Sequence, residues 1–128
     1  MSELLLISHG RYCEELKKSV EMILGSQENI LTLSLGPNDG PDDFRERFEK
    51  IMELSDHFTV FADLIGGTPC NVAARVLMES TKKFDLYAGM NMPMVISYVN
   101  AHLVDKKGSL VSDAKKGIAC VNEIIEQA

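Results

Sequence analysis

His9 and Asp63 are the residues of this 128-residue chain whose types and positions point most directly to chemistry. A histidine whose Nδ1–H donates to a carboxylate keeps its other ring nitrogen, Nε2, free to act as a nucleophile. Asp63 is followed by Leu-Ile-Gly-Gly-Thr-Pro, in which Gly66 and Gly67 let the backbone approach a bound group closely. These residues predict a histidine that attacks, an aspartate that orients it and a glycine-rich loop beside both.

A phosphoryl group is the ligand that fits these loops. The N-terminus of a helix offers free backbone N–H groups and a favourable dipole to an anion, and helices are expected to begin shortly after His9 and beside Thr68. Thr68 is expected either to cap the helix that starts at Pro69 or to donate its hydroxyl to phosphate. Arg11 is placed to contact phosphate, an acidic partner or neither. The predicted phosphate-binding residues are Gly10, Gly66, Gly67 and Thr68.

Each of these features also has a purely structural explanation. A histidine after a strand is more often a capping or solvated residue than a nucleophile, and Gly-Gly-Thr-Pro alone is a turn followed by a helix start. The functional interpretation gains weight if the topology brings both loops to one edge of a sheet. His57 and His102 fall outside these loops, and we expect them to be ordinary surface or boundary residues.

Short apolar runs alternate with amphipathic segments along the chain. The expected strands are residues 3–8, 29–35, 57–63 and 84–88. The expected helices are residues 12–24, 42–55, a segment beginning at Pro69, a segment within 90–100 that follows Pro93, and 109–127.

This alternation predicts parallel strand pairing through right-handed crossovers. The expected fold is α/β and flavodoxin-like, an open, mainly parallel sheet of about four strands with helices on both faces. Ligands of such sheets lie beyond the carboxyl ends of the strands where the strand order reverses, usually between the first and third strands. That rule selects the loops after His9 and after Asp63.

Composition and charge exclude several classes of protein. With 45% hydrophobic and 25% charged residues, the chain is expected to form a single domain over residues 1–128. Its apolar runs are too short to span a membrane and its N-terminus lacks the basic region of a signal peptide, so a cytoplasmic location is expected. A net charge of −6 argues against nucleic acid as a partner.

The three cysteines and the charged segment at residues 105–108 are expected to have structural roles only. Cys13, Cys70 and Cys120 have neither metal-ligand nor disulfide spacing, so we expect small packing residues and no metal site. Residues 105–108 are expected to form a mobile surface turn.

Four segments, taken in order, resemble one known family. They are Ile-Ser-His-Gly at residues 7–10, and residues 16–25, 63–71 and 89–94. They are similar to the enzyme IIA domain of the mannose-family (mannose, fructose and sorbose) phosphoenolpyruvate-dependent sugar phosphotransferase system, and the similarity spans nearly the whole chain.

The resemblance implies that His9 accepts a phosphoryl group from the histidine-containing phosphocarrier protein and passes it to a histidine of enzyme IIB, which then phosphorylates an incoming sugar. Asp63 matches the orienting carboxylate, and Thr68 matches a hydroxyl beside the phosphohistidine. Asn91, Met92 and Pro93 match a loop that borders the site in the family. Such transfer needs no cofactor or metal. The membrane components IIC and IID are implied as indirect partners, and a homodimer is possible for such a protein.

Three features depart from the family's pattern. Cys70 stands where phenylalanine is common, and Glu14 and Glu15 replace a smaller, glycine-containing turn. Some relatives continue into a strand that two subunits exchange, whereas this chain stops after its last expected helix, which puts dimerisation through that strand in doubt. No segment for a fused enzyme IIB is found, so a separate acceptor protein is expected.

Other proteins of this fold class fit less well. A receiver domain needs an acidic pair after the first strand, where Ser8 and His9 stand, and a flavin carrier needs flanking aromatics, for which Tyr12 and Tyr98 are poorly placed. A histidine phosphatase needs an arginine directly before the histidine and a second histidine in the crevice. A phosphocarrier subunit of a dihydroxyacetone kinase stays open within the same chemistry, and a regulator controlled by phosphorylation stays open from another class. The sequence does not name the sugar.

Overall fold

The computed structural model describes residues 2–103 and 109–127. The chain divides into two compact units, Met1–Met90 and Asn91–Ala128. The turn expected at residues 105–108 lies outside the described residues.

The first unit is built on a parallel sheet, as the alternating pattern predicts. Its order, β2-β1-β3-β4, places β1 between β2 and β3, so the strand order reverses between β1 and β3. The register pairs Ile7 with Ala62, which brings the residues that follow them to the same edge. The strands are β1 (Glu3–His9), β2 (Ile30–Leu35), β3 (Phe58–Ala62) and β4 (Asp85–Ala88), within a residue or two of the expected bounds.

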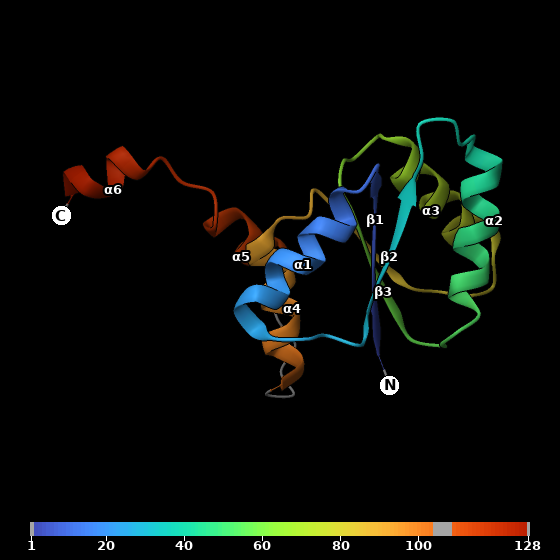
Figure 1. The fold of residues 1–128 in the computed structure, drawn as a ribbon, viewed down its shortest axis with the longest axis horizontal. Coiled ribbons are helices and arrows are strands. Elements are labelled where there is room, and N and C mark those ends of the chain that lie inside the picture. The colour runs from blue at the N-terminus through green and yellow to red at the C-terminus, as the bar shows by residue number, and fades with distance from the viewer. Residues whose placement is uncertain (1, 104–108, 128) are drawn as a thin grey trace. The chain divides into compact units, whose positions relative to one another are not determined.

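Helices cover both faces of this sheet. They are α1 (Tyr12–Leu24), α2 (Pro41–Met52) and α3 (Thr68–Glu79). Figure 1 shows α1 on one side of the strands, with α2 and α3 on the other. Because side chains alternate along a strand, Leu5 and Ile7 of β1 face the α2 and α3 side, where they join Phe44 and Phe48 in the main apolar cluster. The fold class expected from the sequence is confirmed.

Local sequence explains where α2 begins and ends. Gly40 is its N-cap, Pro41 occupies its first turn, and the Asp43 carboxylate accepts the Gly40 N–H at 3.2 Å. The helix ends at Met52 instead of near residue 55, where the backbone turns towards β3.

The second unit contains α4 (Met92–Leu103), α5 (Leu110–Lys116) and α6 (Val121–Gln127). α4 begins one residue before Pro93, and Asn91 caps it, because its Oδ1 accepts the Met94 N–H at 3.0 Å. The Asn91 amide also donates to the Ala114 carbonyl at 3.0 Å, which ties α4 to α5.

The prediction of a single helix over residues 109–127 is wrong. The first helix of this region ends at Lys116, and a second one begins at Val121. Gly117 ends α5, and a Cβ at this glycine would lie 2.3 Å from Cγ of Pro93, so the backbone here packs directly on the proline ring. The apolar spacing that suggested a continuous buried stripe therefore leaves Ile118, Val121 and Ile124 exposed.

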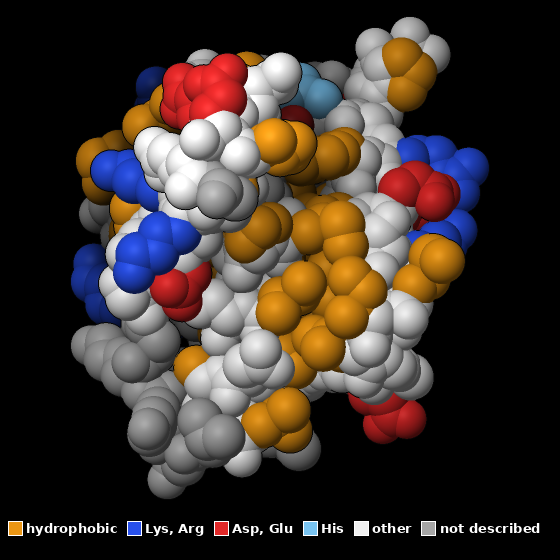
Figure 2. Space-filling view, turned by 90° about the vertical axis from the view of Figure 1, so that its left-hand side faces the viewer, with side chains coloured by type: hydrophobic (Ala, Val, Ile, Leu, Met, Phe, Trp, Pro, Cys, Tyr) orange, Lys and Arg blue, Asp and Glu red, His pale blue; other side chains and the backbone are white. Residues whose placement is uncertain are grey.

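Two further surface features complete the fold. Cys13 and Cys70 are buried as expected, but Cys120 is exposed, so the expectation that it packs in a core is wrong. Large hydrophobic side chains lie at the surface, as the orange areas of Figure 2 show on one face, and Tyr12, Leu64 and Ile65 are among the exposed ones. Within the described residues, no helix is long and apolar enough to cross a membrane.

Candidate active site

His9 and Asp63 meet at the edge of the sheet where the strand order reverses. His9 is the last residue of β1 and Asp63 is the first residue after β3. The Asp63 Oδ2 atom accepts the backbone N–H of His9 at 3.0 Å and lies 2.8 Å from Nδ1 of the same histidine. The sequence therefore predicted correctly that these two side chains would be brought together.

The two hydrogen bonds to Oδ2 also assign the tautomer of His9. A carboxylate only accepts hydrogen bonds, so Nδ1 must carry the proton that it shares with Asp63. In the neutral imidazole, Nε2 is then the nitrogen without a proton, and it belongs to a side chain that is 46% exposed. A nucleophilic nitrogen on a half-exposed side chain is suited to a group carried on another protein.

Asp63 is more enclosed than its partner. Its side chain is 13% exposed, and Oδ1 is buried with no hydrogen-bond partner in the part of the chain that the structure describes. Only Oδ2 of the carboxylate is thus held by hydrogen bonds. The orientation of the carboxylate therefore also depends on the conformation of the main chain at Asp63.

The loop between β3 and α3 packs closely against the His9 ring. Gly66 has φ +83°, the left-handed region that glycine adopts without strain. The Gly67 N–H donates to the Leu64 carbonyl, and Asn71 closes the loop by donating its side-chain amide to the Gly66 carbonyl at 3.2 Å. A Cβ at Gly67 would lie 2.6 Å from Cε1 of His9 and 3.3 Å from Nε2, so only glycine lets the loop come this close.

This packing makes Gly67→Ala a sharp test of the site. The φ of Gly67 is −82°, which alanine accepts, so the variant should fold. Its methyl group must displace the His9 ring, and we expect the phosphoryl transfer predicted from the sequence to slow roughly tenfold or more, because misplacement of a reacting group by about 1 Å is costly. The measurement is the single-turnover rate of His9 phosphorylation.

Gly66→Ala is the matched control. No atom lies within 4 Å of a Cβ at Gly66, so alanine there strains the backbone without touching His9. We expect it to lower the free energy of unfolding by about 1 kcal/mol. Equal transfer rates in the two variants would contradict the role given to Gly67.

Thr68 does not act as the helix cap that its position suggested. The N-cap of α3 is Gly67, Thr68 is the first helical residue, and no side-chain hydrogen bond caps the helix. The left-handed turn at Gly66 shifts the helix start by one residue. The first turn of a helix has N–H groups without intrahelical partners, so this end of α3 can bind an anion.

On the β1 side, Ser8 holds the turn that follows His9, a role that the sequence analysis missed. Ser8 is fully buried, and its Oγ accepts the Cys13 N–H at 2.9 Å while donating to the Gly10 carbonyl at 2.9 Å. Gly10 has φ +57°, and Arg11, the N-cap of α1, makes no capping bond with its side chain. The sequence signal that could have identified Ser8 is its place at the end of an apolar run, because a polar side chain buried there needs hydrogen-bond partners.

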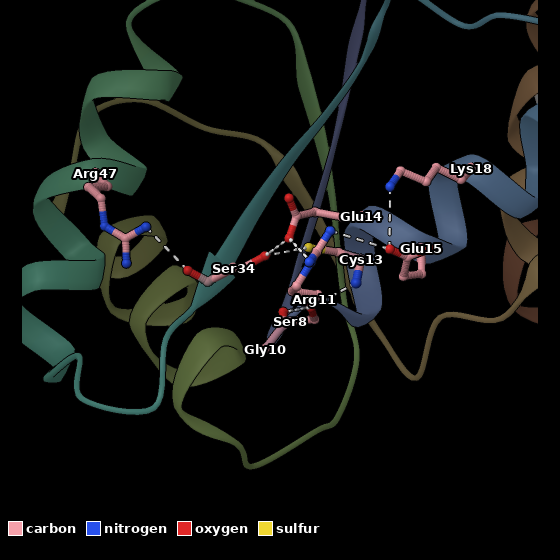
Figure 3. A network of polar contacts seen from close by, with 9 residues as sticks. All are labelled: Ser8, Gly10, Arg11, Cys13, Glu14, Glu15, Lys18, Ser34 and Arg47. Carbon is pink, nitrogen blue, oxygen red and sulfur yellow. Dashed lines mark hydrogen bonds and ion pairs between the residues drawn. The ribbon is translucent and has the colours of Figure 1, made fainter.

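Arg11 belongs to a chain of polar contacts drawn in Figure 3. Its guanidinium lies 3.6 Å from a carboxylate oxygen of Glu14 and 3.6 Å from one of Glu15, and its side chain is 71% exposed. Glu14 also accepts the Ser34 hydroxyl at 3.0 Å, and Arg47 donates to the Ser34 carbonyl. Arg11 thus contacts carboxylates of its own helix, and its predicted contact with phosphate stays a prediction.

Other predicted residues lie elsewhere in the fold. The expected site-bordering residues Asn91, Met92 and Pro93 belong to the second unit, where Asn91 caps α4, and their bordering role stays a prediction. His57 lies just before β3, at the opposite end of that strand from Asp63. His102 lies in α4, with Nδ1 3.0 Å from the Tyr98 carbonyl. Across the described residues, no group of three or more histidine, cysteine or acidic side chains could hold a metal ion.

Comparison with known proteins shows which family the chain belongs to. The sequence profile of the PTS system fructose IIA component matches residues 3–115. The chain belongs to this family. It is thus a IIA component of the mannose family of the phosphotransferase system, a group whose general chemistry is phosphoryl transfer.

Individual relatives support the same assignment. The fructose-specific EIIA component of Bacillus subtilis (strain 168) is 27% identical over 103 residues, which cover 78% of this chain and 70% of that protein. The mannose-specific EIIAB component of Escherichia coli (strain K12) is 29% identical over 97 residues, which cover 73% of this chain but 30% of that protein.

Solved structures of IIA proteins share the fold of this IIA component. A phosphotransferase system component EIIA from Streptococcus agalactiae has a TM-score of 0.86 at 25% identity, over 96% of this chain and 99% of that one. The mannose/sorbose-specific IIA subunit from Enterococcus faecalis has a TM-score of 0.81 at 28% identity, over 93% of each chain.

Proposed function

We propose that this IIA component accepts a phosphoryl group on Nε2 of His9 from the histidine-containing phosphocarrier protein, and passes it to a separate enzyme IIB for sugar uptake and phosphorylation. The whole chain acts as one IIA domain in the cytoplasm, and the membrane components IIC and IID are reached only through enzyme IIB. The observation that carries the proposal is the 2.8 Å contact between Nδ1 of His9 and Oδ2 of Asp63, which leaves Nε2 as the nucleophilic nitrogen of the neutral imidazole, on a side chain that is 46% exposed.

The transfer step follows from this arrangement. The lone pair of Nε2 attacks the phosphorus of the donor's phosphohistidine, a new P–N bond forms, and the donor's P–N bond breaks with its electron pair returning to the donor imidazole. His9 keeps the proton on Nδ1, so its ring becomes positively charged as the new bond forms. The Asp63 carboxylate stabilises that charge and holds the ring in place. Transfer to enzyme IIB is the same step in reverse.

The loop and the helix start beside His9 suit the transferred group. The phosphoryl oxygens are negative, and the proposal assigns to them the free N–H groups of the first turn of α3 and the Thr68 hydroxyl. The N–H groups of Gly10 and Gly67 already donate to the Leu35 and Leu64 carbonyls, so the proposal gives Gly10, Gly66 and Gly67 the role of letting the backbone come close to the phosphoryl group. No metal or cofactor takes part in the proposed step.

Exposed apolar residues beside the site support docking of a protein donor. Leu64 is 57% exposed and Ile65 is 80% exposed, and both directly follow Asp63. The acidic side chains of Glu14 and Glu15, with the chain's net charge of −6, suit a basic partner surface. We therefore assign the rim formed by Leu64 and Ile65 to contact with the phosphocarrier protein.

Ile65→Asp should weaken this contact without changing the chemistry. We expect KM for the phosphorylated donor to rise about tenfold with kcat almost unchanged, because an exposed apolar side chain that becomes buried when the donor binds contributes to affinity and not to the transfer step. Met78→Asp is the matched control, since Met78 is 74% exposed near the far end of α3. A KM that rises equally in both variants would count against a specific rim.

The proposal as a whole is tested by intact-mass analysis. The purified chain is incubated with phosphoenolpyruvate, enzyme I and the phosphocarrier protein, and one acid-labile, base-stable phosphoryl group is expected. Fragmentation should place it on the peptide that contains His9. A chain that gains no phosphoryl group from an active donor system would overturn the proposal and favour a dihydroxyacetone kinase subunit or a regulator with another donor.

The homodimer expected as a possibility from the family resemblance stays a prediction. Exposed apolar residues in α6, Val121, Ile124 and Ile125, are compatible with a contact between two copies. Light scattering of the purified chain would decide between one copy and two.

A further inference from the structure

Tyr12 joins the start of α1 to the end of β4. It is the first residue of α1, three residues after His9, and the residue as a whole is 46% exposed. Its hydroxyl nevertheless donates to the backbone carbonyl of Met90 at 3.0 Å, across 78 positions of the chain.

Met90 is in turn fixed to the residue before Asp63. The backbone N–H groups of Gly89 and Met90 both donate to the Ala62 carbonyl, at 3.0 Å and 3.1 Å. Asp63 then accepts both hydrogen bonds from His9. A closed circuit of hydrogen bonds and short chain segments thus runs from His9 through Asp63 and Met90 to Tyr12, and back along the chain to His9.

We propose that Tyr12 is a positioning residue of the phosphoryl transfer, because its bond to Met90 holds the turn that carries His9 in place against Asp63. The effect on rate rests on the function proposed above, whereas the effect on geometry does not.

The tyrosine bond spans two turns that contain glycines with positive φ. Gly10 lies between His9 and Tyr12 with φ +57°, and Gly89 lies between β4 and Met90 with φ +84°. Glycine itself does little to hold a turn in one conformation. At Gly10 the turn is held by Ser8 and by the Gly10 N–H, which donates to the Leu35 carbonyl at 2.8 Å, and the tyrosine bond adds a tie to the other side of the sheet end. The hydroxyl of Tyr12 closes the circuit across these two turns.

The environment of Asp63 makes this support important. Oδ1 has no partner among the described residues, so the carboxylate is held through Oδ2 and through its own main chain. That main chain is continuous with Ala62, whose carbonyl receives the N–H groups of Gly89 and Met90. Burial and, next, the negative charge of Asp63 raise the pKa of the Tyr12 phenol above its ordinary value, so the group that donates to Met90 is the neutral hydroxyl.

Tyr12→Phe removes the hydroxyl and keeps the ring, so it tests the bond directly. We expect single-turnover phosphorylation of His9 to slow about three- to tenfold, the range set by one net hydrogen bond. We also expect the Met90 amide to exchange faster with deuterium, and the ¹⁵N shifts of the His9 imidazole to show less of the Nδ1–H tautomer. These two readouts report on the turn and on the His9–Asp63 contact.

Tyr87→Phe is the control variant. Tyr87 lies in β4 and packs edge-on against Phe61, with ring centroids 5.7 Å apart, a contact that phenylalanine preserves. We expect it to match the wild type in transfer rate, amide exchange and imidazole shifts.

Two results would overturn the role of Tyr12. One is Tyr12→Phe with the transfer rate and the His9 ¹⁵N shifts of the wild type. The other is slower transfer and lower thermal stability of equal size in both tyrosine variants, which would indicate a general loss of packing. If the wild type itself gains no phosphoryl group, the proposed function fails, but the exchange and imidazole measurements still decide whether Tyr12 positions His9.

Discussion

His9→Ala should gain no phosphoryl group under conditions that fully phosphorylate the wild type. The variant removes the only atom to which the proposed step transfers phosphorus, whereas the backbone N–H that donates to Asp63 stays in place. The exposed position of the side chain means that little packing is lost. Intact mass after incubation with the complete donor system is the measurement.

The two other histidines of the chain provide matched controls. His57 lies before β3 and His102 lies in α4, and neither belongs to the proposed site. His57→Ala and His102→Ala should each gain one phosphoryl group, as the wild type does. Acid-labile phosphate on the His9→Ala chain would show that the acceptor has been assigned to the wrong residue.

Asp63→Asn should slow phosphorylation of His9 about 100-fold or more, on the scale of orienting and electrostatic effects in catalysis. The expected slowing follows from the two hydrogen bonds that Oδ2 of Asp63 accepts from His9. The backbone N–H of His9 needs an acceptor there, so the asparagine amide should place its oxygen at this position and its NH₂ group where Oδ1 was. The oxygen still accepts from Nδ1–H, which preserves the tautomer, but the negative charge that stabilises the phosphorylated ring is lost.

The variant therefore separates charge from geometry. ¹⁵N shifts of His9 should still show the Nδ1–H tautomer in Asp63→Asn, while rapid-quench kinetics should show the slower transfer. Asp85→Asn, at the opposite end of the sheet from His9 at the start of β4, is the control and should transfer at the wild-type rate. A wild-type rate in Asp63→Asn would remove Asp63 from the mechanism.

The arrangement of the sheet and the meeting of His9 with Asp63 could be predicted because both follow from local patterns. Short apolar runs that alternate with amphipathic segments give parallel strands, and parallel strands place their carboxyl ends at one edge. Once β1 and β3 are neighbours in register, the residues that end them must be close. The pairing therefore needed no knowledge of tertiary packing.

What could not be predicted depends on backbone conformation and close packing. The helical spacing of apolar residues continues past position 117, and nothing in it shows that Gly117 packs on the Pro93 ring and ends α5. The left-handed φ of Gly66 moves the start of α3 and takes the capping position from Thr68. Tyr12 bonds a main-chain carbonyl, and such an acceptor leaves no signature in the sequence.

The proposed transfer uses a single ring nitrogen of His9, on a side chain that is 46% exposed, and this bears on how fast a carrier of this kind can work. A donor and an acceptor that must both reach Nε2 need the same small area above the ring, so they bind in turn and never together. The first protein has to leave before the second can arrive, and the lifetime of each complex sets an upper limit on flux. For such a carrier, tight binding is a disadvantage, and we expect short-lived complexes whose dissociation is fast compared with the delivery of sugar.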